Sequence, residues 1–443
     1  MRDVATEVQQ TMAVKAGETE LADYRDFARC VHCGLCLNHC PTYRLWGREA
    51  DSPRGRIRQM FLVDSGEMAM DATFVTHIDR CLDCRACETA CPSGVEYGKL
   101  VELARGRIER EYRRTGMARL GREIFYRRLL PYPKRMAALG GLMRLAQRSG
   151  MQKLAQSTGL LKLMGLETRA ELLPEIDRKF FSTETTRTFP ARGVRRARVA
   201  FFAGCVARMT FSALNDATIR VLQANGCEVV VPEGQWCCGA LAVHAGYRDV
   251  ARELARRNLD VFFAGGDGFD AIVTNAAGCG STMKEYGLLF GPESEDHERA
   301  KGFEDKLRDV TEFLDELGLT APMQRVPLRA TYQDSCHLLH GQKVREAPRR
   351  LIQAVKGVEL VEMELSDQCC GSAGVYNVTQ TETAMALLRK KMECVNATAA
   401  QVILTANPGC LLQLRAGAKL AGDGQEVLHV VELLDRAIEQ ERA

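Results

Sequence analysis

Two runs of closely spaced cysteines constrain this chain more than any other feature of its sequence. The first, CVHCGLCLNHCP, spans residues 30–41, and the second, CLDCRACETACP, spans residues 81–92. Each run places four cysteines within eleven residues and follows the last one with proline. Because the N-terminal sequence lacks the apolar segment of a signal peptide, we expect these thiols to be held reduced in a cytosolic protein. Metal binding is then their leading use.

The spacing C-x2-C-x2-C-x3-C-P is that of the two-cluster bacterial ferredoxins. Three cysteines of a run can reach one [4Fe–4S] cluster, whereas the fourth binds the neighbouring cluster. We therefore predict crossed ligation of two clusters, the first held by Cys30, Cys33, Cys36 and Cys91 and the second by Cys81, Cys84, Cys87 and Cys40. Pro41 and Pro92 are expected to begin helices. Zinc is the weaker alternative, because zinc sites usually pair two distant C-x2-C segments.

The domain organisation follows from length and from the distribution of cysteines. A chain of 443 residues suggests about three domains, and 46% hydrophobic with 26% charged residues is typical of a soluble globular protein. No cysteine occurs between residues 92 and 204. We predict a mostly α-helical ferredoxin-type domain over 20–110 and a basic helical connector over 111–195. In the first of these, Ser52 and Pro53 should cap and begin a helix.

The positive charge of the chain is concentrated in one stretch. Residues 101–150 contain thirteen Lys or Arg against four Glu, a local charge of +9 in a chain whose net charge is +3. Two interpretations stay open, a solvated helical face that pairs with its own neighbours, or a surface that docks on anionic lipid or an acidic partner. The longest uncharged stretch, 394–414, is too polar for a membrane helix, so we expect any membrane contact to be peripheral.

The C-terminal half contains an internal repeat. RVAFFAGC matches RATYQDSC, QWCCGA matches DQCCGSAG, and AIVTNAAGC matches VILTANPGC, with offsets of 131, 132 and 131 residues between corresponding cysteines. We therefore predict two copies of one unit, over 196–325 and 326–443. Short β-rich runs alternate with helical patterns in each copy, which favours parallel α/β sheets with the cysteines at the carboxyl ends of strands.

Each copy contributes four thiols to one edge of its predicted sheet. The two sets are Cys205, Cys237, Cys238 and Cys279 in the first copy and Cys336, Cys369, Cys370 and Cys410 in the second. Four thiols from three loops make a plausible metal pocket, which Gly239 and Gly371 would let the backbone approach closely. The alternative is that these cysteines are small buried apolar residues, as we expect Cys227 and Cys394 to be.

Taken together, these motifs resemble the CCG-domain proteins, which include the heterodisulfide reductase B subunit, the anaerobic glycerol-3-phosphate dehydrogenase C subunit, lactate-utilisation proteins and the glycolate oxidase iron–sulfur subunit. The phrases CVHCGLCLNHCPTYRLWGREADSPRGRI, DRCLDCRACETACPSGVEY, GCGSTMKEYG, CCGSAGVYNVT and TANPGC most resemble the last of these. The resemblance runs from about residue 28 to the C-terminus. It departs from the heterodisulfide reductase pattern at Ala276 and Asn407, where that pattern has a fifth cysteine. A conventional cluster, zinc or an empty thiol pocket therefore all stay open for the two repeat sets.

The sequence also restricts the function. No G-x-G-x-x-G opens a helix after a strand and no P-loop is present, so the chain should need a flavoprotein partner, which carries the FAD, and should not be catalytic alone. The resemblance implies the electron-transfer subunit of a membrane-associated glycolate or other 2-hydroxy acid dehydrogenase, relaying electrons to a quinone-type acceptor. The location implied is cytoplasmic or peripheral on the inner face of the cytoplasmic membrane, without a nucleic acid partner.

Several alternative functions stay open. The chain could serve a lactate or glycerol-3-phosphate dehydrogenase, it could perform thiol chemistry at Cys237–Cys238 or Cys369–Cys370, or it could be a zinc-binding structural scaffold. His244, His337 and His340 lie near the CCG motifs and are candidate quinone contacts, although ordinary hydrogen-bonded histidines are the favoured interpretation. No catalytic residue is predicted.

Overall fold

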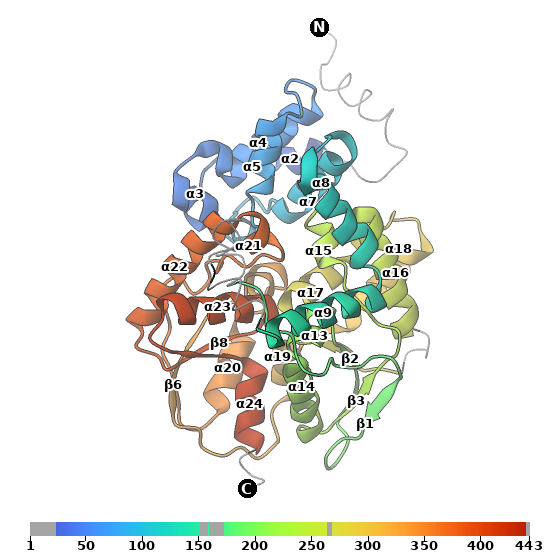
Figure 1. Cartoon of the computed structure of the whole chain (residues 1–443), viewed down its shortest axis with the longest axis vertical. Helices are drawn as coiled ribbons and strands as arrows, with labels where there is room; N and C mark the ends of the chain where they lie inside the picture. The colour runs from blue at the N-terminus through green and yellow to red at the C-terminus, as the bar shows by residue number, and fades with distance from the viewer. Residues whose placement is uncertain (1–23, 151–157, 159–171, 264–267, 440–443) are drawn as a thin grey trace.

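A helical N-terminal segment lies on top of two α/β units (Figure 1). The computed structural model describes residues 24–150, 158, 172–263 and 268–439. The expected ferredoxin-type region is helical, with its elements at α2 (Tyr24–Ala28), η1 (Leu37–His39), α3 (Pro41–Trp46), η2 (Glu49–Asp51), α4 (Pro53–Asp64), α5 (Ala72–Asp79), α6 (Ala86–Thr89) and α7 (Tyr97–Glu111).

Two of the three helix starts predicted in this segment are confirmed, and one is wrong. Ser52 accepts a hydrogen bond from the Gly55 amide at 3.0 Å and Pro53 occupies the first position of α4, as predicted. Pro41 likewise begins α3. The prediction for Pro92 is wrong, because the chain turns there and α7 begins only at Tyr97. Gly94, at φ +63°, supplies the left-handed conformation of this turn.

The connector leads from the helical segment into the first sheet. It contains α8 (Gly116–Glu123), the π-helical η3 (Ile124–Leu129) and α9 (Pro133–Arg148). The short strand β1 (Arg187–Phe189) follows and pairs antiparallel with β3. The sheet of the first unit therefore extends upstream of residue 196, while the domain limits themselves stay a prediction.

The two α/β units share one topology, which supports the predicted repeat. The first sheet has the order β1-β3-β2-β4-β5, in which β2, β3, β4 and β5 run parallel. The second sheet has the order β7-β6-β8-β9 and is parallel throughout. The strands are β2 (Ala197–Phe202), β3 (Cys227–Val231), β4 (Ala271–Thr274), β5 (Leu307–Asp309), β6 (Leu328–Tyr332), β7 (Val358–Leu360), β8 (Val402–Thr405) and β9 (Glu426–His429).

Helices cover the two sheets and join them. In the first unit these are α13 (Val206–Thr210), α14 (Ser212–Ala224), α15 (Ala240–Val243), α16 (Arg248–Phe263), α17 (Ala277–Met283), η4 (Tyr286–Leu289), α18 (Glu295–Lys306) and α19 (Val310–Leu317). In the second they are the π-helical η5 (His337–Gly341), α20 (Glu346–Ala354), α21 (Tyr376–Thr379), α22 (Thr381–Ala397), α23 (Pro408–Ala421) and α24 (Val430–Glu439). Helix α14 packs on α24, and one apolar core contains residues of both units.

The sheet order determines where sites can form. In each unit the chain runs from the first strand to an outer neighbour and then crosses back to the other side of the first strand. This reversal opens a crevice beyond the carboxyl ends of β2 and β4, and of β6 and β8. The repeat cysteines follow these strand ends.

Candidate functional site

The outer of two cysteine-lined cavities lies beside α4, in the helical segment. Its lining includes Cys30, Cys33, Cys36 and Cys91, the four residues predicted to hold one cluster, together with Cys87. Gly34 is at φ +84° on this loop, and a Cβ there would lie 2.7 Å from Arg54 Nη1. Arg54 in turn donates to the His32 carbonyl at 3.0 Å and fixes the loop. Cys33 is exposed, so this cavity reaches the molecular surface.

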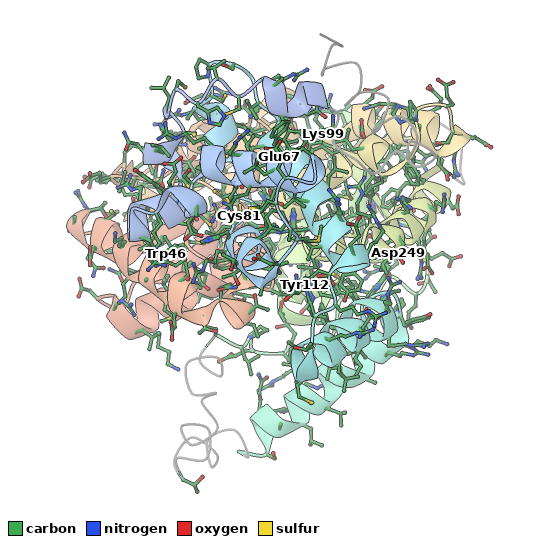
Figure 2. The ribbon with its side chains drawn as sticks, turned by 90° about the horizontal axis from the view of Figure 1, so that it is seen from above. Trp46, Glu67, Cys81, Lys99, Tyr112 and Asp249 are labelled. Atoms are coloured by element: carbon green, nitrogen blue, oxygen red, sulfur yellow. The ribbon has the colours of Figure 1, made fainter. Side chains whose placement is uncertain are left out.

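The inner cavity is lined by the other predicted set, Cys40, Cys81, Cys84 and Cys87. All four of these cysteines are less than 9% exposed. Cys87 lines both cavities, so the two sites adjoin (Figure 2 labels Cys81 near the centre of the molecule).

Two buried polar side chains also line the inner cavity. The cysteine pattern does not reveal them. Tyr97, at the start of α7, donates a hydrogen bond to Cys81 Sγ at 3.5 Å. Arg56 is 1% exposed, donates to the His77 carbonyl at 2.7 Å and pairs with Asp51 at 3.5 Å. A cation and a hydroxyl donor beside sulfur ligands favour the more negative state of whatever the sulfurs bind.

The protonation of the inner thiols bears on what they can hold. Burial raises the pKa of Cys84 and of Cys87 well above the ordinary thiol value, and neighbouring cysteines add to the effect. Without a bound cation these thiols are therefore protonated at neutral pH. A metal centre would have to release those protons on binding, as expected for a thiolate site.

The donor sets of the two cavities are compatible with two [4Fe–4S] cubes. Each cavity brings together the four cysteines of one predicted set. A [4Fe–4S] cube takes one thiolate on each of its four irons, whereas a tetrahedral zinc with Zn–S bonds of about 2.3 Å needs its four sulfurs about 3.8 Å apart.

The four thiols of the first repeat form a connected row. Cys205 follows β2, Cys237 and Cys238 follow β3, and Cys279 lies in α17 after β4. Side-chain hydrogen bonds link Cys205 to Cys237, Cys237 to Cys238 and Cys238 to Cys279. Gly239, at φ +89°, turns the backbone so that its amide donates to Cys237 Sγ at 3.4 Å.

The second repeat builds the same row from Cys336, Cys369, Cys370 and Cys410. Gly371 is at φ +93° and its amide donates to Cys369 Sγ at 3.4 Å. Asn407, at the position where the heterodisulfide reductase pattern has a fifth cysteine, donates to Cys410 Sγ at 3.5 Å. The same side chain accepts from the Gly278 amide at 3.2 Å and so joins the two repeats.

Only one of these two rows shares a cluster of packed residues with the ferredoxin-type segment. Cys84 belongs to an apolar cluster that also contains Cys369 and the adjoining Cys336. The first row instead packs in a cluster formed by its own unit and the connector, to which Tyr126 and Leu130 belong. The second row therefore lies next to the inner cavity, an asymmetry that the matched sequences of the repeats do not predict.

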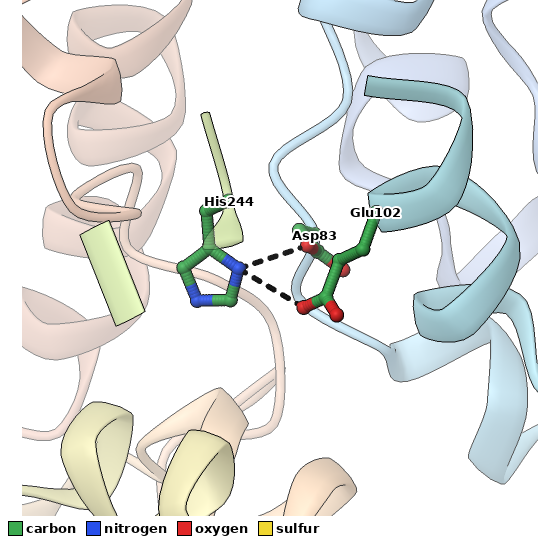
Figure 3. A group of neighbouring side chains, drawn as sticks. All are labelled: Asp83, Glu102 and His244. Atoms are coloured by element: carbon green, nitrogen blue, oxygen red, sulfur yellow. Dashed lines mark hydrogen bonds and ion pairs between the residues drawn. The ribbon is translucent and has the colours of Figure 1, made fainter. Parts of the chain in front are cut away.

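A buried charged cluster fixes the loop between Cys81 and Cys84. Figure 3 shows His244, which follows α15 of the first unit, facing Asp83 and Glu102 of the helical segment. Its Nδ1 lies 3.0 Å from Asp83 Oδ2 and 3.2 Å from Glu102 Oε1. Burial alone would lower the pKa of His244, but the hydrogen bonds to these carboxylates outweigh it and raise the pKa to about 9. The ring is therefore an imidazolium at neutral pH.

Two arginines complete the charge balance around these carboxylates. Arg85 pairs with Glu102 at 3.2 Å and with Glu285, and Arg105 lies 3.5 Å from Asp83. With three cations already on the carboxylates, the group acts as a junction between the helical segment and the first unit and not as a cation site.

The other residues singled out in the sequence have ordinary partners. His337 Nε2 donates to the Asp83 carbonyl at 2.8 Å, and burial lowers its pKa to about 4. His340 accepts from Thr89 Oγ1 at 2.9 Å and donates to the Asp367 carbonyl at 3.1 Å. Cys227 is buried in the core as expected, whereas Cys394 on α22 is only half-buried.

Comparison with known proteins agrees with this architecture. The family model described as "4Fe-4S dicluster domain" matches residues 26–95, and "Cysteine-rich domain" matches 199–284 and 330–415. Between them, "Glycolate oxidase iron-sulfur subunit, linker region" matches 112–173. No helix in the described residues has the length and apolar character needed to cross a bilayer.

Curated relatives extend over nearly the whole chain. The "Probable glycolate oxidase iron-sulfur subunit" of Bacillus subtilis is 40% identical over 422 residues, covering 94% of this chain and 95% of the relative. The "Glycolate oxidase iron-sulfur subunit" of Escherichia coli is 32% identical over 93% of this chain and 94% of its own length. "Lactate utilization protein A" of Bacillus subtilis is 30% identical over 54% of this chain and 99% of its length. The chain thus belongs to the family of glycolate oxidase iron–sulfur subunits.

Proposed function

We propose that this chain is the electron-transfer subunit of a glycolate dehydrogenase complex, accepting electrons from an FAD-containing flavoprotein subunit and passing them to a quinone-type acceptor at the inner face of the cytoplasmic membrane. The observation that carries the proposal is the pair of adjoining cysteine cavities, one reaching the surface at Cys33 and the other buried. The names of the near full-length relatives support glycolate as the substrate of the complex.

Two sets of cysteines would hold the two clusters of the proposed relay. Cys30, Cys33, Cys36 and Cys91 would hold an outer [4Fe–4S] cluster, and Cys40, Cys81, Cys84 and Cys87 an inner one. When bound, such clusters supply one-electron redox chemistry. The loop around Cys33 leaves the outer site accessible to a protein donor. Tyr97 and Arg56 exclude water from the inner site and stabilise negative charge there.

The experiment begins with anaerobic purification of the chain with its flavoprotein subunits. We expect about eight irons and acid-labile sulfides for two cubes, EPR signals after reduction, and glycolate-dependent reduction of a quinone analogue. More than eight irons would place additional metal in the repeat rows. Zinc without labile sulfide would rule out the electron-transfer function. Reduction of the quinone analogue with lactate or glycerol 3-phosphate, but not with glycolate, would show that glycolate is not the substrate of the complex.

A second candidate is thiol chemistry in the repeats, favoured by the hydrogen-bonded rows of thiols in both units. Alkylation of Cys237–Cys238 or Cys369–Cys370 would then abolish activity while the iron content and the EPR signals of both cubes persist. Retention of glycolate-dependent quinone reduction after alkylation would exclude this candidate.

A further inference from the structure

The connector forms a ridge whose apolar side chains stand in solvent. Helix α8 buries none of its residues. Met117, Leu120 and Ile124 are 80%, 51% and 44% exposed, and their spacing places them along one side of α8 and the start of η3. An eight-residue helix without a buried face lacks the packing that stabilises short helices, so this side is suited to a further contact.

Helix α9 continues the apolar surface. Leu142 and Leu145 are 66% and 64% exposed, and Tyr132 before the helix is 42% exposed. Six of the thirteen large apolar side chains that are exposed in the described residues therefore fall between positions 117 and 145. We call the segment from Arg113 to Arg148 the connector ridge. Its apolar side chains are concentrated far beyond what scattered surface residues would give.

The connector ridge is also strongly cationic. Residues 113–150 contain ten Lys or Arg and a single acidic residue, Glu123, a local charge of +9. Some of these cations are paired within the molecule, Arg114 with Asp79 and Arg122 with Glu109. Others extend into solvent, among them Arg113, Arg119, Arg128, Lys134 and Arg148. The paired cations support the first interpretation of the basic stretch, and the exposed cations leave the docking interpretation to be tested.

We infer that the connector ridge is the surface by which this subunit docks on an anionic lipid bilayer. An interfacial helix needs exposed apolar side chains and cations on the same surface, since the apolar groups enter the lipid while the cations remain at the headgroups. The ridge helices provide both, with exposed Met, Leu and Ile side chains between arginines. Each cation near an anionic surface adds about fivefold to binding. An acidic protein would be attracted to the charge, but it would not by itself require apolar side chains that project outward.

The position of the ridge agrees with this assignment. In Figure 2 the teal connector helices lie at the edge opposite the blue segment that carries the first cysteine run. The ridge can therefore rest on a membrane while the surface around Cys33 stays free for a protein donor. The inference rests on the proposed function, because a quinone-type acceptor resides in the bilayer and docking would bring the subunit to it.

The test is flotation of the purified, cluster-loaded chain with vesicles of phosphatidylcholine alone or with about 30% phosphatidylglycerol. We expect binding only to the anionic vesicles, weakened at about 0.5 M salt. Met117→Asp with Leu120→Asp should weaken binding at least about tenfold. Arg119→Gln with Arg128→Gln should weaken vesicle binding about 25-fold, because each of the two lost cations accounts for about fivefold.

Matched controls alter similar residues elsewhere on the surface. Val194→Asp with Leu420→Asp removes two exposed apolar side chains, and Arg345→Gln with Lys356→Gln removes two exposed cations. Both pairs should bind vesicles like the unmodified chain. The inference is overturned if anionic vesicles do not bind, if ridge and control variants bind alike, or if the ridge variants lose only the flavoprotein subunit.

The proposed function has a separate readout. Glycolate-dependent reduction of a water-soluble quinone analogue should be unchanged in the ridge variants, whose iron content and circular dichroism must match those of the controls. Loss of lipid binding with this activity intact supports the inference. Absence of the activity from the unmodified complex would count against the proposed function. It would not affect the measurement of vesicle binding.

Discussion

The hydroxyl of Tyr97 acts directly on one sulfur of the inner site. It donates to Cys81 Sγ from a fully buried position, and burial raises the pKa of Tyr97 well above its ordinary value, so the phenol keeps its proton. A hydrogen bond to a ligand sulfur stabilises the reduced, more negative form of a cluster.

Tyr97→Phe should therefore lower the midpoint potential of the inner cluster by ~40 mV, which corresponds to about 1 kcal/mol for a one-electron couple. EPR-monitored redox titration measures this shift. The outer cluster should keep its potential and serves as the internal control. An unchanged inner potential would mean that the hydroxyl does not reach the ligand sulfur.

At this scale the sequence predicted the cysteines and missed their surroundings. The spacing within each run predicted which sulfurs line each cavity, because ligand spacing reflects the shape of the core that such a run binds. Tyr97 and Arg56 were not predicted to approach these sulfurs, since nothing in their local sequence distinguishes them from ordinary core residues. Asp83 lies inside the second run, yet its partner His244 is 161 residues away.

At the scale of elements, the two CCG turns offer a matched pair of glycines. Gly239 and Gly371 both have left-handed φ angles. A Cβ on Gly239 would lie 3.4 Å from Ala251, an ordinary contact, whereas a Cβ on Gly371 would lie 2.6 Å from the Ala384 carbonyl oxygen of α22.

Gly239→Ala should lower the free energy of unfolding by about 1–2 kcal/mol through backbone strain alone. Gly371→Ala should lower it by about 1–3 kcal/mol more, because α22 would have to move. Thermal or denaturant unfolding of the two variants provides the comparison. Equal losses in the free energy of unfolding would show that α22 can move at no measurable cost.

The packing of Cys84 against the second thiol row gives another prediction for the elements. Cys369→Ala removes a sulfur from the apolar cluster that contains Cys84, so it should alter the EPR line shape and potential of the inner cluster. Cys237→Ala, the corresponding change in the first repeat, should leave both unchanged. Identical spectra for the two variants would contradict the asymmetry.

The elements themselves were largely predictable, for identifiable reasons. Three landmarks at nearly constant offset predicted the repeat, and apolar runs such as CEVVV predicted the parallel strands. Strand β1 has three residues and was not predicted, because an edge strand that short carries no periodic pattern. The position of Pro92 after a cysteine run predicts a helix start, but Ser93 and Gly94 after it favour a turn.

At the scale of the whole molecule, the loop around Cys81, from Arg80 to Asp83, joins all three parts of the chain. Asp83 contacts His244 of the first unit through its side chain and His337 of the second through its carbonyl. Tyr376 adds a hydrogen bond to the Arg80 carbonyl at 2.9 Å. These contacts link residues more than 150 positions apart, which is why the sequence alone could not place the helical segment on the repeats.

The imidazolium of His244 makes this junction sensitive to pH. Its folded pKa of about 9 lies above the ordinary value of 6.5, so its contribution to stability is fully present below pH 6.5 and is lost as pH rises through about 9. We expect the stability difference between the unmodified chain and His244→Gln to shrink over this range. Thermal unfolding between these pH values measures it, and a constant difference would show that the ring is neutral.

The burial of Cys40, Cys81, Cys84 and Cys87 has a consequence for how the protein is made. All four are less than 9% exposed, and the second repeat packs over Cys84. A cube held by these four cysteines, as proposed, would be too large to enter through such a closed surface, so iron and sulfide would have to arrive before the last step of folding. Maturation in the cell would then be ordered, with the assembly machinery acting on an open chain and the repeats closing over the finished product.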